Sequence, residues 1–286
     1  MRRIIERISV IARIFFLSPT LFLKKAIGRI LLKIVPSPKG ATTIHVGGYT
    51  IVTWPSRNDW WKLMYIGYCG VEIAHNIRKF LIESGVFIDV GAGVGYFTAI
   101  ASKIVGNSGE VHCFEPLPPN ISAIQEMIQS KPNSNIILNS CALGVDNSVH
   151  SYFIERFDNY TMSSMVSTFN NMENISEKIE VKTKRLDKYL EQKNIREVSL
   201  IKIDVEGYEY FVLKGLEGYF KKNADRPPII VEIAPQVCEI LGYSLREFYD
   251  FMRDYGYEAY NIFNPSRKKD IRLIHETTDV IFRVVQ

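Results

Sequence analysis

The stretch Val86-Phe-Ile-Asp-Val-Gly-Ala-Gly-Val-Gly-Tyr-Phe-Thr98 decides the fold of this chain of 286 residues. A short apolar run ends in an acid, Gly91, Gly93 and Gly95 alternate after it, and a helix is expected to begin near Phe97. Glycine has no Cβ, so the backbone can turn sharply and approach a ligand, and the following helix N-terminus favours an anionic group. The pattern predicts a ligand-binding turn between a strand and a helix.

Two kinds of cofactor suit such a turn. A dinucleotide would place its pyrophosphate there, and its fingerprint reads GxGxxG. S-adenosylmethionine would place its amino-acid carboxylate there, with Asp89 positioned to hold the ammonium group. The spacing here is DxGxGxG, which favours S-adenosylmethionine over a nicotinamide cofactor. A purely structural turn is the alternative for this loop taken alone.

Strand-like and helix-like segments alternate from Gly85 onward, which predicts an α/β fold with a doubly wound parallel sheet. One strand is expected over Ile136–Ala142. Residues 258–263 and 280–285 are β-rich and flank a polar stretch, 264–270, so they predict a terminal antiparallel hairpin around a turn. Between residues 149 and 183 the alternation stops, and this segment is expected to be an insertion on the substrate side, with a strand at each end.

Acidic residues follow three of the predicted strands. Glu115-Pro116 comes directly after the strand Glu110–Phe114, where a carboxylate can accept hydrogen bonds from the two ribose hydroxyls of a nucleoside cofactor. Asp204 and Glu206 follow the apolar strand Leu200–Ile203, and Glu232 ends the strand beginning at Ile229. Because the carboxyl ends of parallel strands meet at one edge of the sheet, these acids are expected to face the substrate.

A carboxylate close to an alcohol can take its proton as a new bond to oxygen forms. Asp204 is the first candidate for this role, followed by Glu206 and Glu232. Three alternatives stay open: Lys202 and arginines neutralise the acids, Asp204 and Glu232 hold Mg²⁺, or a histidine, His45 or His275, acts as the base.

These motifs together resemble the FkbM family of methyltransferases over about residues 70–260. The matching residues are Phe87–Thr98, Phe114-Glu115-Pro116, Ala142-Leu143-Gly144, Arg185-Leu186-Asp187, Ile201–Glu209, Val212–Gly215 and Val231-Glu232. The resemblance implies a seven-stranded class I methyltransferase that uses S-adenosylmethionine, usually for O-methylation of sugars or secondary metabolites. The family often carries Asn where Gly93 stands, so no side-chain contact is assigned there. The implied cofactor-binding residues are Asp89, Gly91, Ala92, Gly93, Gly95, Phe97, Thr98, Glu115, Pro116, Ala142, Leu143 and Asp204.

Residues 1–41 form a basic extension that precedes the resemblance. Residues 1–33 contain eight Lys or Arg and one acid, Glu6, and Pro19 divides their apolar content into two short predicted helices. Ile14–Leu23 is too short to cross a bilayer, which takes about 20 residues. Two interpretations stay open for residues 1–35: peripheral contact with an anionic membrane, or packing on the domain or on a second subunit.

Residues 42–84 are expected to form a hairpin around Gly47-Gly48, a loop over Trp54–Tyr68 and a helix over Val71–Ile82, before a catalytic domain at 85–286.

The catalytic part lacks the basic, aromatic surface typical of nucleic-acid enzymes, so the expected acceptor is a small molecule or glycan. Four dispersed cysteines in apolar runs predict reduced thiols in a cytoplasmic protein without a zinc site. The membrane interpretation of residues 1–35 would place this protein at the inner face of the membrane.

Overall fold

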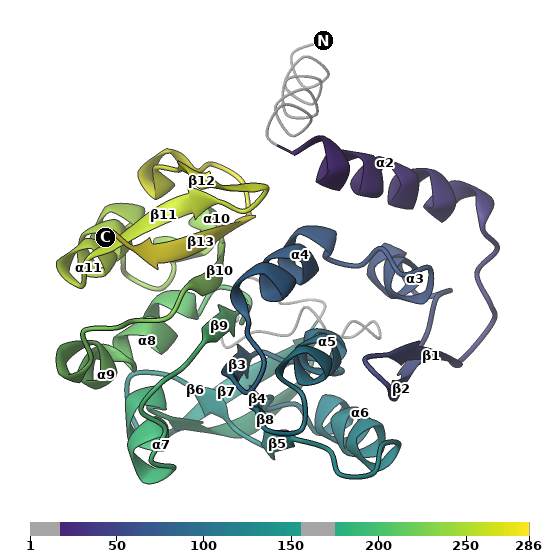
Figure 1. The fold of residues 1–286 in the computed structure, drawn as a ribbon, viewed down its shortest axis with the longest axis horizontal. Coiled ribbons are helices and arrows are strands. Elements are labelled where there is room, and N and C mark those ends of the chain that lie inside the picture. The colour runs from purple at the N-terminus through teal and green to yellow at the C-terminus, as the bar shows by residue number, and fades with distance from the viewer. Residues whose placement is uncertain (1–17, 156–174, 286) are drawn as a thin grey trace.

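The computed structural model describes residues 18–155 and 175–285, which fold around an eight-stranded sheet (Figure 1). Its strand order is β12-β11-β13-β10-β9-β3-β4-β5. The chain runs outward from β3 through β4 to β5 and then crosses back to β9, on the other side of β3, so the strand order reverses between β3 and β9. The parallel strands are β3 (Val86–Val90), β4 (Glu110–Phe114), β5 (Ile136–Asn139), β9 (Leu200–Ile203) and β10 (Ile229–Ile233).

Helices cover both faces of this sheet, because neighbouring strand residues point to opposite sides. Phe87 packs in one core with α4, α5 and α6, whereas Ile88 packs in a second core with α7, α8, α9 and α11. The doubly wound α/β prediction is therefore confirmed. The helices are α4 (Val71–Phe80), α5 (Tyr96–Val105), α6 (Pro118–Gln129), α7 (Leu186–Gln192), α8 (Glu209–Lys214), α9 (Glu217–Lys222), α10 (Pro235–Cys238) and α11 (Leu245–Asp254).

The sheet has one strand more than the seven expected, and the additional strand lies in its C-terminal part. β11 (Tyr257–Asn261) and β13 (Thr278–Val284) pair antiparallel, as the sequence predicted. The stretch expected to be a turn instead contains β12 (Asn264–Lys268), which pairs with β11 at the edge, and the short 3-10 helix η2 (Ile271–Leu273). A polar strand that contains Pro265 is tolerated at this place because an edge strand needs only one hydrogen-bonded neighbour.

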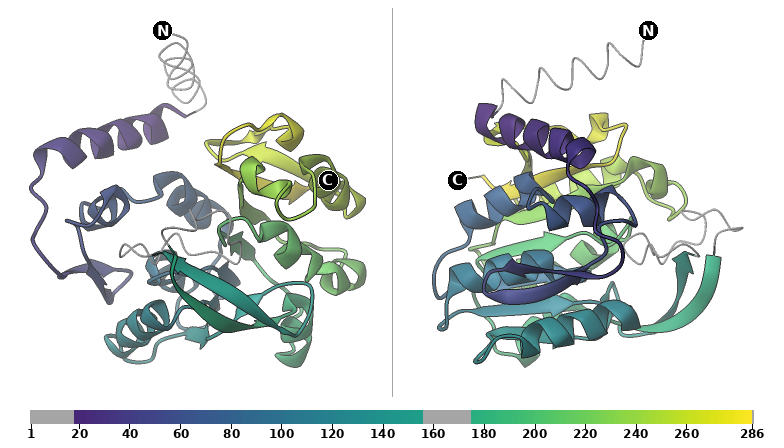
Figure 2. Two further views of the ribbon diagram at one scale, coloured as in Figure 1. Left: turned by 180° about the vertical axis from the view of Figure 1, so that it is seen from behind. Right: turned by 90° about the vertical axis from the view of Figure 1, so that its right-hand side faces the viewer.

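The predicted insertion contributes a separate three-stranded sheet of order β6-β8-β7. β7 (Val149–Glu155) and β8 (Ile175–Lys184) form the expected strand at each end, and Figure 2 shows them projecting from the body of the domain. The single strand predicted over 136–142 was wrong. The chain turns after β5, where the Cys141 amide donates to the Asn139 carbonyl oxygen, and β6 (Ala142–Leu143) then pairs with β8.

The N-terminal elements add to the core on the α5 side of the sheet. The hairpin of β1 (Thr42–Val46) and β2 (Tyr49–Thr53) forms as predicted, but the expected loop after it contains a helix, α3 (Asp59–Tyr65), capped by the Asn58 side chain. The first predicted basic helix lies outside the described residues, and the second is α2 (Pro19–Ile34). Among the described helices none is long and apolar enough to cross a membrane.

Candidate active site

A cavity of about 450 Å³ opens at the carboxyl ends of β3, β4, β9 and β10. It lies beside the reversal in strand order, which is where ligands bind in open α/β sheets. Its lining includes nine of the twelve residues assigned to the cofactor and all three candidate catalytic acids. These residues are Gly91, Ala92, Gly93, Phe97, Glu115, Pro116, Ala142, Leu143, Asp204, Glu206 and Glu232.

The alternate glycines of the β3–α5 turn serve different purposes. All three have positive φ, but a Cβ on Gly91 would lie 1.9 Å from the Asp204 carbonyl oxygen, and a Cβ on Gly95 would meet Met127 at 2.8 Å. These two glycines therefore allow close packing inside the protein. Only Gly93 has no heavy atom within 4 Å of the added Cβ. Gly93 is the open position of the turn, whereas the assignment of all three glycines to the cofactor stays a prediction.

Three residues assigned to the cofactor lie behind the cavity lining: Asp89, Gly95 and Thr98. Asp89 is fully buried, and its Oδ2 accepts a hydrogen bond of 2.6 Å from the Thr98 hydroxyl. The Lys202 Nζ lies 3.4 Å from Asp89 Oδ1. Burial raises the pKa of Asp89, and Lys202 and Thr98 oppose this effect. These contacts hold Asp89 directly beneath the glycine turn, and its assignment as a ligand of the ammonium group stays a prediction.

Lys202 connects the glycine turn to the acids at the sheet edge. Its buried Nζ donates to the Gly91 carbonyl oxygen at 3.0 Å and lies 3.4 Å from Asp204 Oδ2. Burial alone would lower the pKa of Lys202, but the carboxylates of Asp204 and Asp89 raise it above its ordinary value. Lys202 therefore stays charged and neutralises part of the acidic cluster, as one of the sequence-based alternatives proposed.

Glu115 lies at the end of β4, where it faces the glycine turn. Its Oε2 accepts from the Gly93 amide at 2.8 Å and its Oε1 from the Leu117 amide at 3.0 Å. Burial raises the pKa of Glu115 to about 7, although these two backbone donors act in the opposite direction. A carboxylate has about four acceptor sites, so Glu115 retains acceptor capacity toward the cavity that it lines.

The turn after β9 holds Asp204 and Glu206 at the cavity. Buried Glu209 fixes this turn, because its Oε1 accepts from the amides of Val205 and Gly207 at 3.0 Å each. Glu206 has a φ of 54°, in the left-handed region that residues other than glycine rarely adopt. Strain of this kind is common at functional sites, where the surrounding structure enforces it.

The carboxylates at this edge repel one another. Burial and then the charges of Asp204 and Glu206 raise the pKa of Glu232 well above its ordinary value. Asp279, directly opposite Glu232 on β13, also has a raised pKa, about 7, because of burial and Asp204. The edge therefore holds protons at neutral pH that isolated carboxylates would lose.

Sequence reasoning missed a wall of the cavity formed by Asn58, Asp59 and Trp60, at the start of α3. These residues precede the glycine turn by about thirty positions and reach the site only through tertiary packing.

The described cavity lining contains no histidine, so neither His45 nor His275 reaches it. Within residues 18–155 and 175–285 no group of three or more His, Cys, Asp or Glu side chains is arranged to hold a metal ion.

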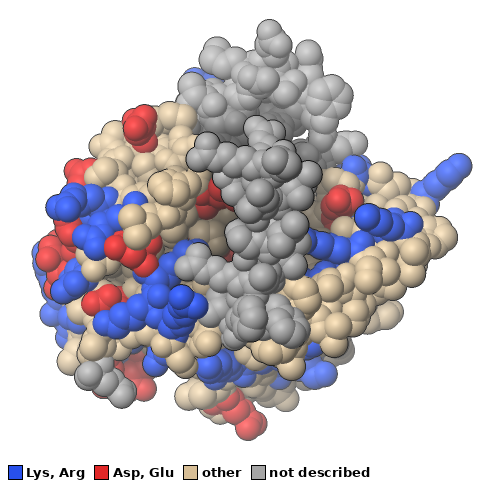
Figure 3. Space-filling view, turned by 90° about the horizontal axis from the view of Figure 1, so that it is seen from above, with Lys and Arg blue, Asp and Glu red and all other residues tan. Residues whose placement is uncertain are grey.

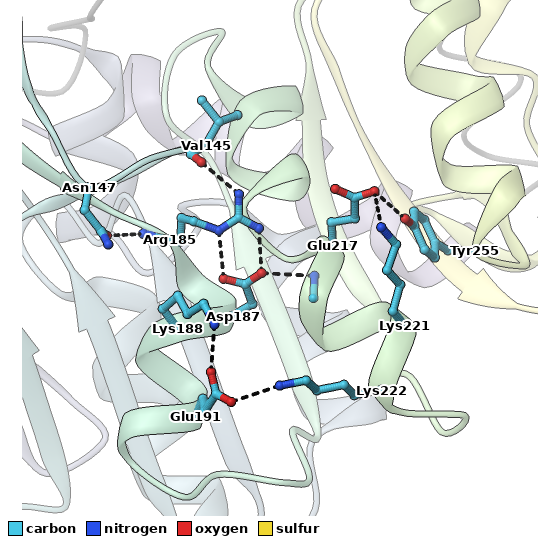
Figure 4. A network of polar contacts seen from close by, with 11 residues as sticks. Val145, Asn147, Arg185, Asp187, Lys188, Glu191, Glu217, Lys221, Lys222 and Tyr255 are labelled. Carbon is cyan, nitrogen blue, oxygen red and sulfur yellow. Dashed lines mark hydrogen bonds and ion pairs between the residues drawn. The ribbon is translucent and has the colours of Figure 1, made fainter.

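The motif Arg185-Leu186-Asp187 lies away from this cavity and has a structural role (Figure 4). Arg185 donates from Nε and Nη2 to the two oxygens of Asp187 at 3.0 and 2.6 Å, and from Nη1 to the Val145 carbonyl oxygen. Asp187 also accepts from the Gly218 amide at 3.0 Å. The motif thus joins the β6–β7 loop, α7 and α9.

Residues 89–259 match the methyltransferase FkbM domain. A curated relative, Methyltransferase 1 of Beauveria bassiana (strain ARSEF 2860), is 27% identical over 187 residues, which cover 60% of this chain and 72% of the relative. Among solved structures, a methyltransferase FkbM from Methylobacillus flagellatus KT aligns with 14% identity and a TM-score of 0.41, over 80% of this chain and 56% of that chain. A SAM-dependent O-methyltransferase from Thermotoga maritima aligns with 13% identity and a TM-score of 0.42, over 86% and 78% of the two chains.

Proposed function

Since the chain belongs to the FkbM methyltransferase family, we propose that it uses S-adenosylmethionine to methylate a hydroxyl group of a sugar, a glycan or a secondary metabolite. One observation carries this proposal: a single cavity joins the glycine turn and Glu115 to three carboxylates at the ends of β9 and β10. The first part suits a nucleoside cofactor, and the second suits an acceptor that loses a proton.

The residues of the first part fit S-adenosylmethionine. Gly93 leaves open space at the turn, and α5, ten residues long, begins without a side-chain cap, so its first amide groups are available to the amino-acid carboxylate. Glu115 offers carboxylate oxygens to the ribose hydroxyls. When bound, the cofactor supplies an electrophilic methyl group on a sulfonium sulfur.

Asp204 is the proposed proton acceptor. Its side chain is 33% exposed, lines the cavity, and is held near Lys202 at the edge where an acceptor would enter. A hydroxyl group loses its proton as its oxygen forms a new bond, and a positioned carboxylate takes that proton. Glu206 is the second candidate.

Glu232 has a different proposed role. With its raised pKa it carries a proton at neutral pH, so it donates a hydrogen bond to the acceptor or to a neighbouring carboxylate rather than acting as a base. In this arrangement the acidic edge orients a hydroxyl group between one donor and one acceptor.

The test is a methyl-transfer screen with radiolabelled S-adenosylmethionine against lipid-linked glycans and small hydroxylated metabolites. We expect the label to appear in a methyl ether, and EDTA to leave the rate unchanged. Transfer only to nitrogen or carbon would contradict the proposed O-methylation. Loss of activity with EDTA, restored by Mg²⁺, would favour the magnesium-assisted alternative at Asp204 and Glu232.

A further inference from the structure

Helix α2 has two faces with different surroundings. Its inner face packs on the domain: Leu21 and Gly28 are buried, Gly28 against Tyr68, and Lys25 forms an ion pair with Glu72 of α4. Lys62 of α3 donates to the Leu32 carbonyl oxygen at 2.6 Å. The interpretation that this segment packs on the domain therefore applies to the inner face of α2. The contacts hold α2 in a defined orientation on the domain.

The outer face of α2 carries an uncovered apolar stripe. Leu23, Ile27, Ile30 and Ile34 follow one another at spacings of four, three and four residues, which place them on one side of a helix. Leu23 is 58% exposed, Ile30 58% and Ile34 67%. Eight large apolar side chains are strongly exposed among the described residues, and three of them lie on this helix. Exposed apolar side chains are therefore concentrated on α2.

Basic residues border the stripe. Lys24, Arg29 and Lys33 are exposed on either side of it, and α2 contains no acidic residue. Figure 3 looks down on this side of the molecule, where blue side chains, with red beside them, interrupt a largely tan surface on the right. An apolar stripe with cationic borders complements the surface of an anionic bilayer, in which apolar side chains enter the interface and cations meet headgroup phosphates.

A cationic cavity lies beside the stripe, between α2 and α4. It has a volume of about 360 Å³, and Lys24, His75 and Arg78 line it without any acidic residue. None of these three side chains forms an ion pair with another described residue. Burial lowers the pKa of His75, and the charges of Lys79, Lys24 and Arg78 lower it further, which reflects a positive environment. The positive charges of Lys24 and Arg78 at this cavity suit an anionic group such as a phosphate.

We propose that the outer face of α2 binds the surface of an anionic membrane, with Leu23, Ile27, Ile30 and Ile34 in the interface and a lipid phosphate at the Lys24–Arg78 cavity. Residues 1–17 precede this helix and are rich in Ile, Phe and Arg, so the sequence extends the same composition. The proposal does not depend on methyl transfer. A glycan acceptor carried on a lipid would be presented at the same surface.

The test is flotation of the full chain with vesicles of phosphatidylcholine alone or mixed with phosphatidylglycerol. We expect flotation with the anionic vesicles only, and its loss at about 1 M salt, where charges are screened within roughly 3 Å. Ile30→Ser should weaken binding about tenfold or more, because one isoleucine leaves the interface. Lys24→Gln should weaken it about fivefold.

Leu273→Ser is the matched control, because Leu273 is 71% exposed on η2, away from α2. It should bind vesicles like the wild type, and all variants should keep the wild-type melting temperature and S-adenosylhomocysteine affinity. Three outcomes would overturn the proposal: no flotation of the full chain, equal flotation of Ile30→Ser and wild type, which would assign binding to residues 1–17, or a dimer in solution that Ile30→Ser dissociates, which would make a second copy the occupant of the stripe.

Discussion

Two groups of charged residues in this protein differ in whether their carboxylates have cationic partners. Around α7 and α9, each carboxylate has a cationic partner (Figure 4): Asp187 binds Arg185, and Glu191 lies 3.0 Å from Lys188 and 2.9 Å from Lys222. At the ends of β9 and β10, acids outnumber cations, and Lys202 is the cation that directly contacts Asp204.

The two groups consequently respond to pH in opposite directions. Hydrogen bonds from Lys222 and Lys188 lower the pKa of Glu191 to about 2, so its contribution to stability is present above the unfolded pKa and lost as the pH falls. Burial raises the pKa of Glu232, so its contribution is present at low pH and lost as the pH rises. The ion pairs of the first group stabilise the fold. Repulsion among the carboxylates of the second group destabilises it, which is typical of a reactive site.

The largest predicted effect is on catalysis. Asp204→Asn removes the proposed proton acceptor, so turnover should fall about 10²–10⁴-fold while S-adenosylhomocysteine binds as in the wild type. The measurement is radiolabelled methyl transfer to an acceptor found in the screen, with calorimetry for the ligand. Asp187→Asn is the control, and its turnover should match the wild type at a temperature where both are folded. Turnover that survives in Asp204→Asn would move the role to Glu206.

The next effect is on stability. Asp187→Ala leaves Arg185 and the Gly218 amide without their partner, and breaking a buried ion pair costs about 3–5 kcal/mol. Since the Arg185 side chain is 26% exposed, solvent offsets part of the loss, and a value of about 3 kcal/mol is expected. Urea unfolding measures it. A loss of turnover without a loss of stability would mean that this network belongs to the active site.

The smallest predicted effect concerns the pH dependence of stability at the sheet edge. Glu232→Gln removes a carboxyl group whose charged form destabilises the folded protein, increasingly so as the pH rises and the proton is lost. The variant should therefore match the wild type near pH 5 and gain on the order of 1 kcal/mol, about 2–4 °C in melting temperature, near pH 9. Thermal unfolding at both pH values tests this. A variant that is less stable at pH 9 would show that Glu232 is paired there.

Several parts of the site could be predicted because strand ends are easy to locate in an apolar sequence. Glu115, Asp204 and Glu232 each follow a β-rich run, and all three line the cavity. Asp89 also ends such a run but does not line it. Its side chain lies on the same face as that of Phe87, two residues earlier, and this face is covered by α5, from which Thr98 reaches it.

Other features depend on contacts that the sequence alone does not reveal. Gly91 and Gly93 look equivalent in the motif, yet Gly91 packs against the backbone of Asp204, more than one hundred residues away. β12 was missed because its residues are polar, and a strand at a sheet edge needs no apolar face. Trp60 joins the cavity through the packing of α3, which no local pattern encodes.

The affinity for the cofactor should also depend on pH, because burial raises the pKa of Glu115 to about 7. Below this pH the carboxyl group holds a proton and is a poorer acceptor for ribose hydroxyls. The wild-type affinity for S-adenosylhomocysteine should therefore fall as the pH decreases from 8 to 6, and Glu115→Gln should show a flat profile. Parallel profiles in the two proteins would assign the dependence to another group.

The proposed position of the cofactor, between the glycine turn and Glu115, is tested most directly by calorimetric titration with S-adenosylhomocysteine at pH 8. Glu115→Gln should bind about 10- to 150-fold more weakly than the wild type, corresponding to the ~1.5–3 kcal/mol of a hydrogen bond to a charged group. Asp187→Asn, in the paired network, should bind like the wild type. Equal affinities in Glu115→Gln and the wild type would contradict this position of the cofactor.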